Sequence, residues 1–250
     1  MADTDVLYLY GGGFEGFLCA CAEAHALGAR RPVVESADRS DGWLMETVTV
    51  PPDPDRARRL AGRLALAGGG ATMDEVCRCF LAETPGAESA LAAFILLTLE
   101  RGRCVLGMRQ DPSVREVRAL AQRVGFEAHR LCGLLRFSEL GDGTLYARCS
   151  PDHNVLLPLA AHFQARLPRE QWVIHDVNRG VAVLWDGAEL LPATAPYPGD
   201  MPLSDAEETF RQLWRQFTRT ISVAERTNPA LQRKLMPRRY WTHLVERPEG

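Results

Sequence analysis

Apolar positions recur at helical spacing through the middle of the chain. Between residues 54 and 134, four segments place apolar side chains three and four positions apart, and glycine or proline separates one segment from the next. This spacing predicts amphipathic helices, because residues three and four apart lie on one face of a helix. The predicted helices cover residues 55–66, 73–83, 88–101 and 113–134.

Short apolar or alternating runs towards both ends of the chain predict strands. Residues 6–10 form such a run, followed by three glycines, Gly11 to Gly13, and a predicted helix. The glycines serve a tight turn or, alternatively, cradle a phosphate where the helix begins. Residues 190–200 are rich in proline and are predicted to be a surface connection. Further strands are predicted at 44–50, 133–140, 144–149, 172–177 and 181–185.

These elements predict an α+β fold with a small mixed or antiparallel sheet, a helix-rich central segment and a helical C-terminus. Ser204 and Glu207 have the spacing of a capping box at the start of the C-terminal helix. We expect the first strand to join the sheet formed by the later hairpins. We also expect a single domain over residues 1–250, in which residues 54–134 can form a helical subdomain.

Composition limits the class of protein. No apolar run approaches the roughly 20 residues that a membrane-spanning helix needs, so we expect no membrane association. The cysteines number seven and no signal sequence precedes them, which favours a cytoplasmic protein with free thiols. Their C-x-C pairs do not match zinc or iron–sulfur spacing. We therefore expect no metal site and no cofactor.

Positive charge is concentrated near the C-terminus, although the whole chain carries a net charge of −3. Between Phe210 and Tyr240 the cations include Arg219 and Arg226, and Glu225 is the only acid. Guanidinium groups match phosphate, and aromatic rings beside them suit exposed bases. The alternative is a helical face that is merely solvated. The predicted nucleic-acid-binding residues are Arg211, Arg215, Arg233, Lys234, Arg238, Arg239, Tyr240 and Trp241.

Histidines and carboxylates gather between residues 152 and 176. His153, His175 and Asp176 could act as an acid/base group on a substrate. Alternatively, Asp152 caps the next helix and the histidines are buried with satisfied hydrogen bonds. No motif with a known mechanism identifies an enzyme, so this choice stays open.

Six segments of the chain occur in a characteristic order: Tyr10–Leu18, His129–Phe137, Pro151–Asn154, His162–Phe163, Trp172–Asp176 and Asn228–Trp241. Their order and spacing resemble a bacterial family associated with DNA metabolism and DNA repair. Members of that family are encoded beside a radical SAM protein, and some are fused to a uracil-DNA-glycosylase-like domain. In this chain, glycines replace an acid and a hydroxyl residue of the family's first motif, whereas Glu15 is retained.

The resemblance and the residues lead to three hypotheses. The first is a DNA-repair protein that binds single-stranded or damaged DNA and works with a radical SAM partner. The second is a self-standing enzyme that acts on a nucleic-acid lesion with Glu15, His153, His175 and Asp176 as acid/base residues. The third is an adaptor that docks the radical SAM protein through its arginine and aromatic surface.

Overall fold

The computed structural model describes residues 6–39, 45–194, 196, 199, 201–221 and 228–246, without the side chain of Arg219. The chain forms two compact units, Met1–Gly125 and Phe126–Gly250. The boundary lies inside helix α5 (Pro112–Leu134). Helices and two sheets occur together, which confirms the predicted α+β class.

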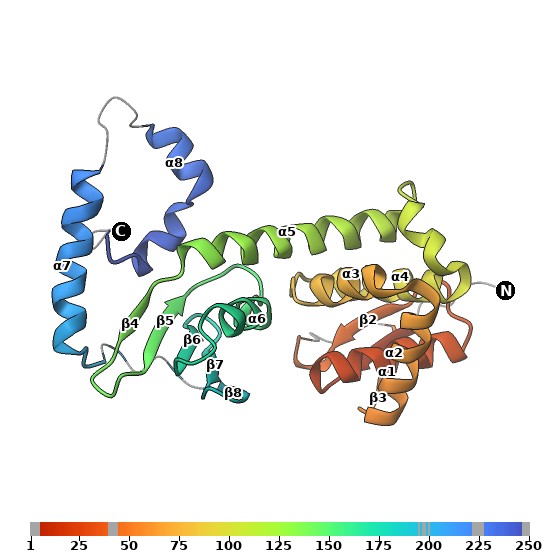
Figure 1. Cartoon of the computed structure of the whole chain (residues 1–250). Helices are drawn as coiled ribbons and strands as arrows, with labels where there is room; N and C mark the ends of the chain where they lie inside the picture. Colours follow the sequence, from red (N-terminus) through yellow and green to blue (C-terminus); the bar gives the residue numbers. More distant parts are fainter. Residues whose placement is uncertain are drawn as a thin grey trace. The chain divides into compact units, whose positions relative to one another are not determined.

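A three-stranded parallel sheet forms the centre of the N-terminal unit (Figure 1). The strands are β1 (Val6–Tyr10), β2 (Val33–Ser36) and β3 (Glu46–Val50), and β1 lies between the other two. Our expectation that the first strand joins the later hairpins is therefore wrong. Parallel strands need a long crossover, and helix α1 (Gly13–Ala26) supplies one between β1 and β2.

Glycines make the turn from β1 into α1 possible. Gly12 and Gly13 have φ angles of 77° and 65°, a region that favours glycine. A Cβ atom added at Gly16 would lie 1.6 Å from the carbonyl oxygen of Gly11. The turn therefore requires glycine for its backbone shape and for the close approach of α1.

Helices cover the small sheet and build the core of this unit. Helices α1 and α4 contact the strands, and α2 packs against α1 and α4. Phe17 and Phe94 are fully buried at the centre of this packing. The four predicted central helices are confirmed, with ends shifted by a few residues. The remaining helical elements are η1 (Ala37–Arg39), α2 (Pro54–Gly68), α3 (Gly70–Phe80), α4 (Ala87–Arg101) and η2 (Gly102–Gly107).

A five-stranded sheet in the order β4-β5-β6-β7-β8 forms the C-terminal unit. Strands β5 and β6 are parallel and the other pairs are antiparallel, so the sheet is mixed as predicted. Helix α6 (Leu156–Arg166) connects the parallel pair. The strands are β4 (Phe137–Glu139), β5 (Leu145–Cys149), β6 (Trp172–Asp176), β7 (Val181–Trp185) and β8 (Leu190–Thr194).

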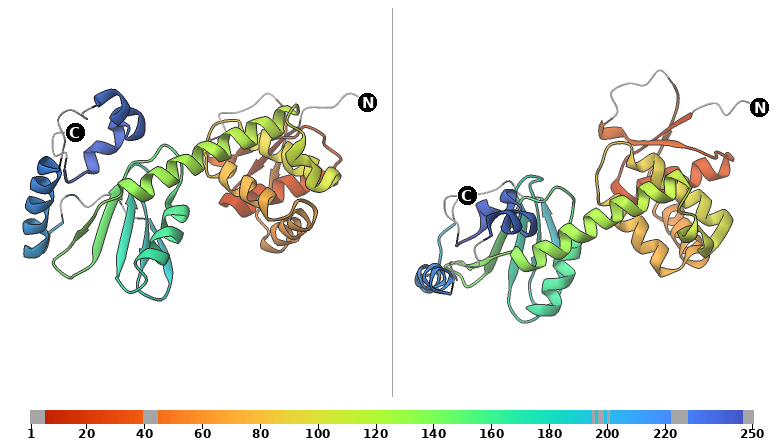
Figure 2. Two further views of the ribbon diagram at one scale, coloured as in Figure 1. Left: turned by 45° about the horizontal axis from the view of Figure 1, so that its top comes forward. Right: turned by 90° about the horizontal axis from the view of Figure 1, so that it is seen from above.

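Helix α6 covers one face of this sheet (Figure 2). The ring centroid of Phe163 lies 4.9 Å from that of Phe137, and Phe137 also contacts Trp172. Side chains alternate along a strand, so the neighbours of Phe137 along β4 and β5 point the other way. Ser138 and its register partner Tyr146 consequently lie on the opposite face.

Strand β8 corrects the prediction that residues 190–200 form only a surface connection. Leu190–Thr194 pairs with β7, with Pro192 opposite Val183. Proline lacks an N–H and is tolerated on an edge strand, where one side of the backbone has no partner strand.

The C-terminus of the described chain is helical, as predicted. Ser204 caps α7 (Asp205–Thr220), because its hydroxyl oxygen accepts a hydrogen bond from the Glu207 N–H at 3.1 Å. Helix α8 (Pro229–Leu235) and the short helix η4 (Arg238–His243) follow. Glu225 and Arg226 lie outside the described residues, as does the side chain of Arg219. Within the described ranges, no helix combines the length and the apolar character needed to cross a membrane.

Candidate nucleic-acid interface

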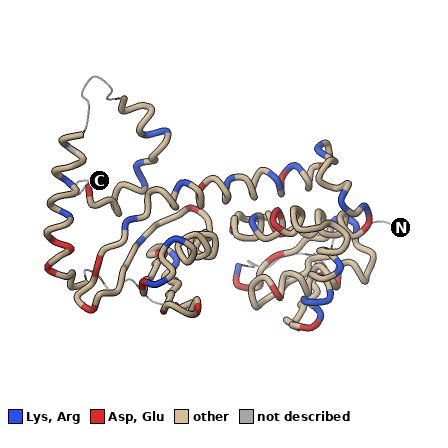
Figure 3. Tube along the Cα trace, in the orientation of Figure 1, with Lys and Arg blue, Asp and Glu red and all other residues tan. Residues whose placement is uncertain are grey.

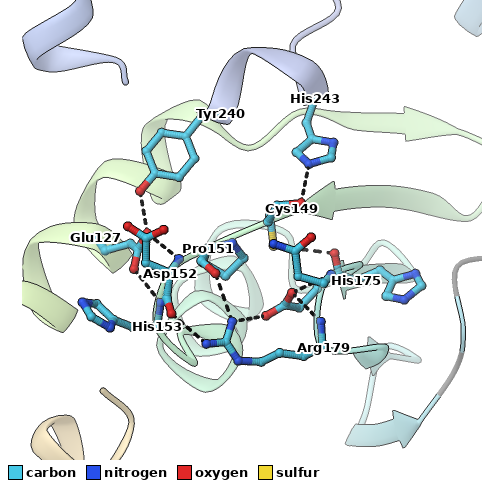
Figure 4. A network of polar contacts seen from close by, with 12 residues as sticks. Glu127, Cys149, Pro151, Asp152, His153, His175, Arg179, Tyr240 and His243 are labelled. Carbon is cyan, nitrogen blue, oxygen red and sulfur yellow. Dashed lines mark hydrogen bonds and ion pairs between the residues drawn. The ribbon is translucent and has the colours of Figure 1, made fainter. Parts of the chain in front are cut away.

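A buried carboxylate, Glu127 on α5, joins three parts of the C-terminal unit (Figure 4). Its oxygens accept hydrogen bonds from the backbone N–H of Asp152 at 3.0 Å and of His153 at 2.9 Å. The Tyr240 hydroxyl donates to it at 2.5 Å. Glu127 therefore ties the loop after β5 and the C-terminal segment to the helix.

Tyr240 is buried by this contact, with 2 % of its surface exposed. Burial raises the pKa of Tyr240 to about 12, and the hydrogen bond to Glu127 acts in the same direction. The phenol stays protonated and donates to the carboxylate at ordinary pH. Its ring has no exposed face for a base, so the predicted stacking role does not fit Tyr240.

Arg239 points into the same network. Its Nη2 atom lies 2.9 Å from the Asp152 carboxylate and 3.9 Å from Glu127, and its guanidinium lies 4.8 Å from the centre of the Tyr240 ring. Asp152 therefore pairs with Arg239. It does not cap α6, because Val155 occupies that position without a side-chain bond. Arg239 organises the C-terminal segment as well as carrying charge.

Two of the predicted acid/base residues, His175 and Asp176, are buried at the end of β6, 2 % and 0 % exposed. His175 Nδ1 lies 2.8 Å from the Tyr146 hydroxyl. Asp176 Oδ2 lies 2.8 Å from Arg179 Nη1, which also donates to the Pro151 carbonyl. These contacts hold neighbouring side chains and backbone in place. They correspond to the alternative of buried, satisfied groups.

The other two acid/base candidates, His153 and Glu15, do not form one described cluster with His175 and Asp176. His153 is half-buried and its backbone N–H is bound to Glu127. Glu15 is an exposed residue of α1 in the N-terminal unit. Within the described ranges, no three His, Cys, Asp or Glu side chains are grouped so that they could hold a metal ion.

Exposed cations lie on the C-terminal segment that follows α7 (Figure 3). Arg233 and Lys234 on α8 and Arg238 on η4 are exposed, and none of them forms an ion pair with another described residue. The Arg238 guanidinium lies 5.7 Å from the centre of the Trp241 ring, whose Nε1 donates to the Met236 carbonyl at 2.9 Å. This segment therefore presents positive charge beside a fixed aromatic ring.

Helix α7 adds a row of aromatic rings. Phe210 and Trp214 stack with centroids 6.4 Å apart and an interplanar angle of 12°, and Trp214 and Phe217 with 5.7 Å and 30°. Phe210 and Phe217 are 58 % and 50 % exposed. Such stacked, accessible rings suit either bases or the apolar side chains of a protein.

The two predicted arginines of α7 face the sheet. Arg211 is bound by Glu207 and Ser138, and Arg215 Nε donates to the Val245 carbonyl at 3.1 Å. They line a pocket together with Arg136 and Arg148, which were not predicted. Arg148 lies two positions after Tyr146, and side chains two positions apart on a strand point to the same face of the sheet. The sequence therefore contained a signal that these two side chains lie together. The Arg136 guanidinium pairs with Glu246 at 2.8 Å.

Comparison with known proteins identifies one family. No curated protein matches the chain, and no solved structure does. A family model described as a domain of unknown function, DUF4130, matches residues 85–246. This range covers more than half of the chain and contains the described residues of the C-terminal unit, with all of the cations and rings above. The chain therefore belongs to the DUF4130 family.

Proposed function

We propose that the protein binds single-stranded or damaged DNA through its C-terminal unit and acts in DNA repair or modification in the cytoplasm. The observation that carries this proposal is the exposed group of Arg233, Lys234 and Arg238 without described acidic partners. Cations that keep their charge at the surface can replace the counterions of a phosphate backbone. The resemblance adds a radical SAM protein as the proposed partner in the reaction.

Ring contacts favour single strands over duplex DNA. Phe210 and Phe217 expose about half of their surface on α7, and bases can stack on such rings only when they are not paired inside a duplex. Arg211 and Arg215 lie on the same helix but face the sheet, so the charge contacts of the proposed interface come from Arg233, Lys234 and Arg238. Stacking contributes about 1–3 kcal/mol per base.

A matched pair of variants tests the proposal. Arg233→Gln with Arg238→Gln removes two exposed cations from the proposed interface, and Arg166→Gln with Arg169→Gln removes two exposed cations from elsewhere in the unit. Affinity for a fluorescent single-stranded oligonucleotide is measured by anisotropy over a series of salt concentrations. The first variant is expected to lower the slope of log K against log salt by about 1.4, which is about 0.7 per lost contact. The second is expected to leave the slope unchanged.

Equal slopes for the two variants, or no binding by the parent protein, would reject the proposal. Circular dichroism of both variants checks that the fold is retained.

An apolar face on α7 favours a second candidate, an adaptor that docks the radical SAM protein. Leu213 and Phe217 on α7 and Ile221 directly after it are each at least half exposed, and large apolar side chains that are exposed and contiguous mark protein interfaces. Co-purification at low and high salt separates the two functions. Binding of DNA weakens as salt rises, whereas an apolar contact persists. Phe217→Ser should abolish a protein contact of this kind at both salt concentrations.

A further inference from the structure

A wide, open groove with a volume of about 1060 Å³ lies along α4 in the N-terminal unit. Its walls come from α4, from the connection between α1 and β2, and from the start of α5. The floor of this α4 groove is apolar and includes Pro32, Leu96 and Leu97. About nine residues of a helix that is about 10 Å wide would fill this volume. The α4 groove therefore has the size of a docking site for a helix.

The sequence of α4 is apolar on every side. From position 91 to position 99 the only polar residue is Thr98, and its hydroxyl donates to the Phe94 carbonyl at 2.8 Å. A helix that is apolar all round is typically buried all round. Leu91 and Phe94 are 1 % and 0 % exposed, whereas Leu97 lines the groove and is only half-buried. The groove is therefore the side of α4 that no described element covers fully.

The two walls of the groove carry opposite charge. Arg30 and Arg31, on the connection between α1 and β2, are exposed, and neither forms an ion pair with another described residue. The start of α5 contributes two acids, Asp111 and Glu116. The remaining charged residues of the lining, Arg101 and Glu100, pair with each other at 3.1 Å. A helix that fits this groove thus needs acidic side chains beside the two arginines and none beside α5.

Helix α7 has the apolar face that such a groove accepts. Phe210, Leu213 and Phe217 lie three and four positions apart on one helical face and are 58 %, 60 % and 50 % exposed. Figure 1 shows α7 at the edge of the C-terminal unit, where it contacts β4. The stretch from Phe210 to Phe217 is about as long as the helix that the α4 groove can hold.

The charges of α7 are also distributed as the groove requires. Asp205 and Glu208 in its first turn are exposed, and neither forms an ion pair with another described residue. No acid follows Glu208 in the helix. With its first turn beside Arg30 and Arg31, α7 would place its acids at the positive wall and its acid-free part beside α5. Complementary charges of this kind fix the orientation of a contact.

We propose that α7 of one copy of the chain docks in the α4 groove of a second copy. Each copy offers one groove and one helix, so the contact joins two different surfaces. It closes into a dimer when two copies exchange both contacts, and otherwise it forms open chains. The proposal does not rest on DNA binding. Phe210 and Phe217 belong to both surfaces, so docking and the proposed base stacking exclude each other at these rings.

Sedimentation equilibrium of the full chain tests for self-association. Over concentrations from about 1 to about 200 μM, the range of weak protein contacts, the average mass is expected to rise above the 27.7 kDa of one copy. A mass of one copy at every concentration overturns the proposal.

Reversing the charge on either side tests the orientation. Arg30→Glu with Arg31→Glu changes the groove, and Asp205→Lys with Glu208→Lys changes the helix in a separate variant. Each variant brings like charges together across the contact, so each is expected to weaken association by at least about tenfold. All four side chains are exposed, and circular dichroism checks that the fold is retained.

A matched control changes the net charge by the same amount elsewhere in the N-terminal unit. Arg58→Glu with Arg59→Glu alters two exposed residues of α2 that do not line the groove. This variant is expected to associate like the parent. Equal weakening by the control and by the groove variant overturns the proposal, because net charge and not the groove then governs association.

Mixing the two reversed variants gives the sharpest test. In an equimolar mixture, each groove can meet a helix of opposite charge, so association is expected to return to within about threefold of the parent. A mixture that stays as weak as its components overturns the proposed pairing. If the helix variant alone loses association and the groove variant does not, α7 contacts another part of the second copy, and the assignment to the α4 groove is overturned.

Discussion

Replacing Glu127 with glutamine tests the network that positions the C-terminal segment. The carboxylate is 3 % exposed and accepts three hydrogen bonds, from the N–H groups of Asp152 and His153 and from the Tyr240 hydroxyl. Glutamine has nearly the same shape but replaces one oxygen with an NH₂ group. At least one of the two N–H groups and the Tyr240 hydroxyl must then face the glutamine NH₂ group, which cannot accept its hydrogen bond.

The expected loss of stability follows from these contacts. Oε1 accepts two of the bonds and Oε2 accepts the third, from His153. In the better orientation the amide keeps the first two and loses the third, which leaves a buried donor unsatisfied at a cost of about 1–3 kcal/mol. The remaining two bonds weaken because a neutral oxygen accepts less strongly than a carboxylate. We therefore expect Glu127→Gln to lower the free energy of unfolding by about 3 kcal/mol.

Urea unfolding followed by tryptophan fluorescence measures this loss. Four of the five tryptophans lie in the C-terminal unit, so the signal reports mainly on that unit. With a slope of about 1–3 kcal/mol per molar urea, the midpoint should fall by about 1 M or more. Glu170→Gln is the control, because Glu170 is exposed. If both variants unfold at the parental midpoint, the network does not stabilise the unit as described. The four tryptophans are Trp172, Trp185, Trp214 and Trp241.

Substitutions at three further positions give independent tests of the fold. Gly16→Ala should destabilise the N-terminal unit by about 3 kcal/mol or more, because its Cβ would lie 1.6 Å from the Gly11 carbonyl oxygen. Thermal unfolding followed by circular dichroism should show a lower melting temperature for the variant than for the parent, and an unchanged melting temperature would contradict this prediction. Ser204→Ala should lower the stability of the C-terminal unit by about 1 kcal/mol in urea, and Ser204→Asp should restore most of it, since aspartate also accepts from the first turn of α7. Burial, followed by a nearby arginine, lowers the pKa of His243 below its usual value of about 6.5. As pH falls from about 7, the unfolded chain therefore takes up a proton before the folded chain does, and the free energy of unfolding decreases. His243→Gln should make this decrease shallower, and identical pH profiles for variant and parent would contradict the assignment.

Periodicity in the sequence predicted most elements but not the partners of every strand. The four central helices and the strand pairs β4–β5 and β6–β7 follow from local patterns of apolar, glycine and proline residues. Placement of β1 in its own parallel sheet depends on contacts with β2 and β3, which no local pattern encodes. Strand β8 was missed because Pro192 is typical of a loop, although an edge strand accepts it.

Residue types at the candidate interface were predictable, whereas their orientations were not. Arg239 and Tyr240 turn inward because Glu127, 113 residues before Tyr240, supplies a buried carboxylate. The sequence contained one signal for this buried carboxylate. Glu127 shares a helical face with Val124, Ala128 and Leu131, all of which are buried. An acid on such a face predicts a buried partner, but the sequence does not say which one.

Both borders of the five-stranded sheet are poor templates for an additional strand. Along β4, the Glu139 N–H donates to the Glu207 side chain and its carbonyl accepts from the Ser204 N–H, so the backbone groups of that residue are already occupied. Along β8, Pro192 interrupts the row of donors. An extended peptide would find little to pair with at either border, and β-augmentation by a partner is disfavoured. Recognition by this unit is therefore expected to depend on side chains, which can be exchanged one at a time without disturbing the sheet.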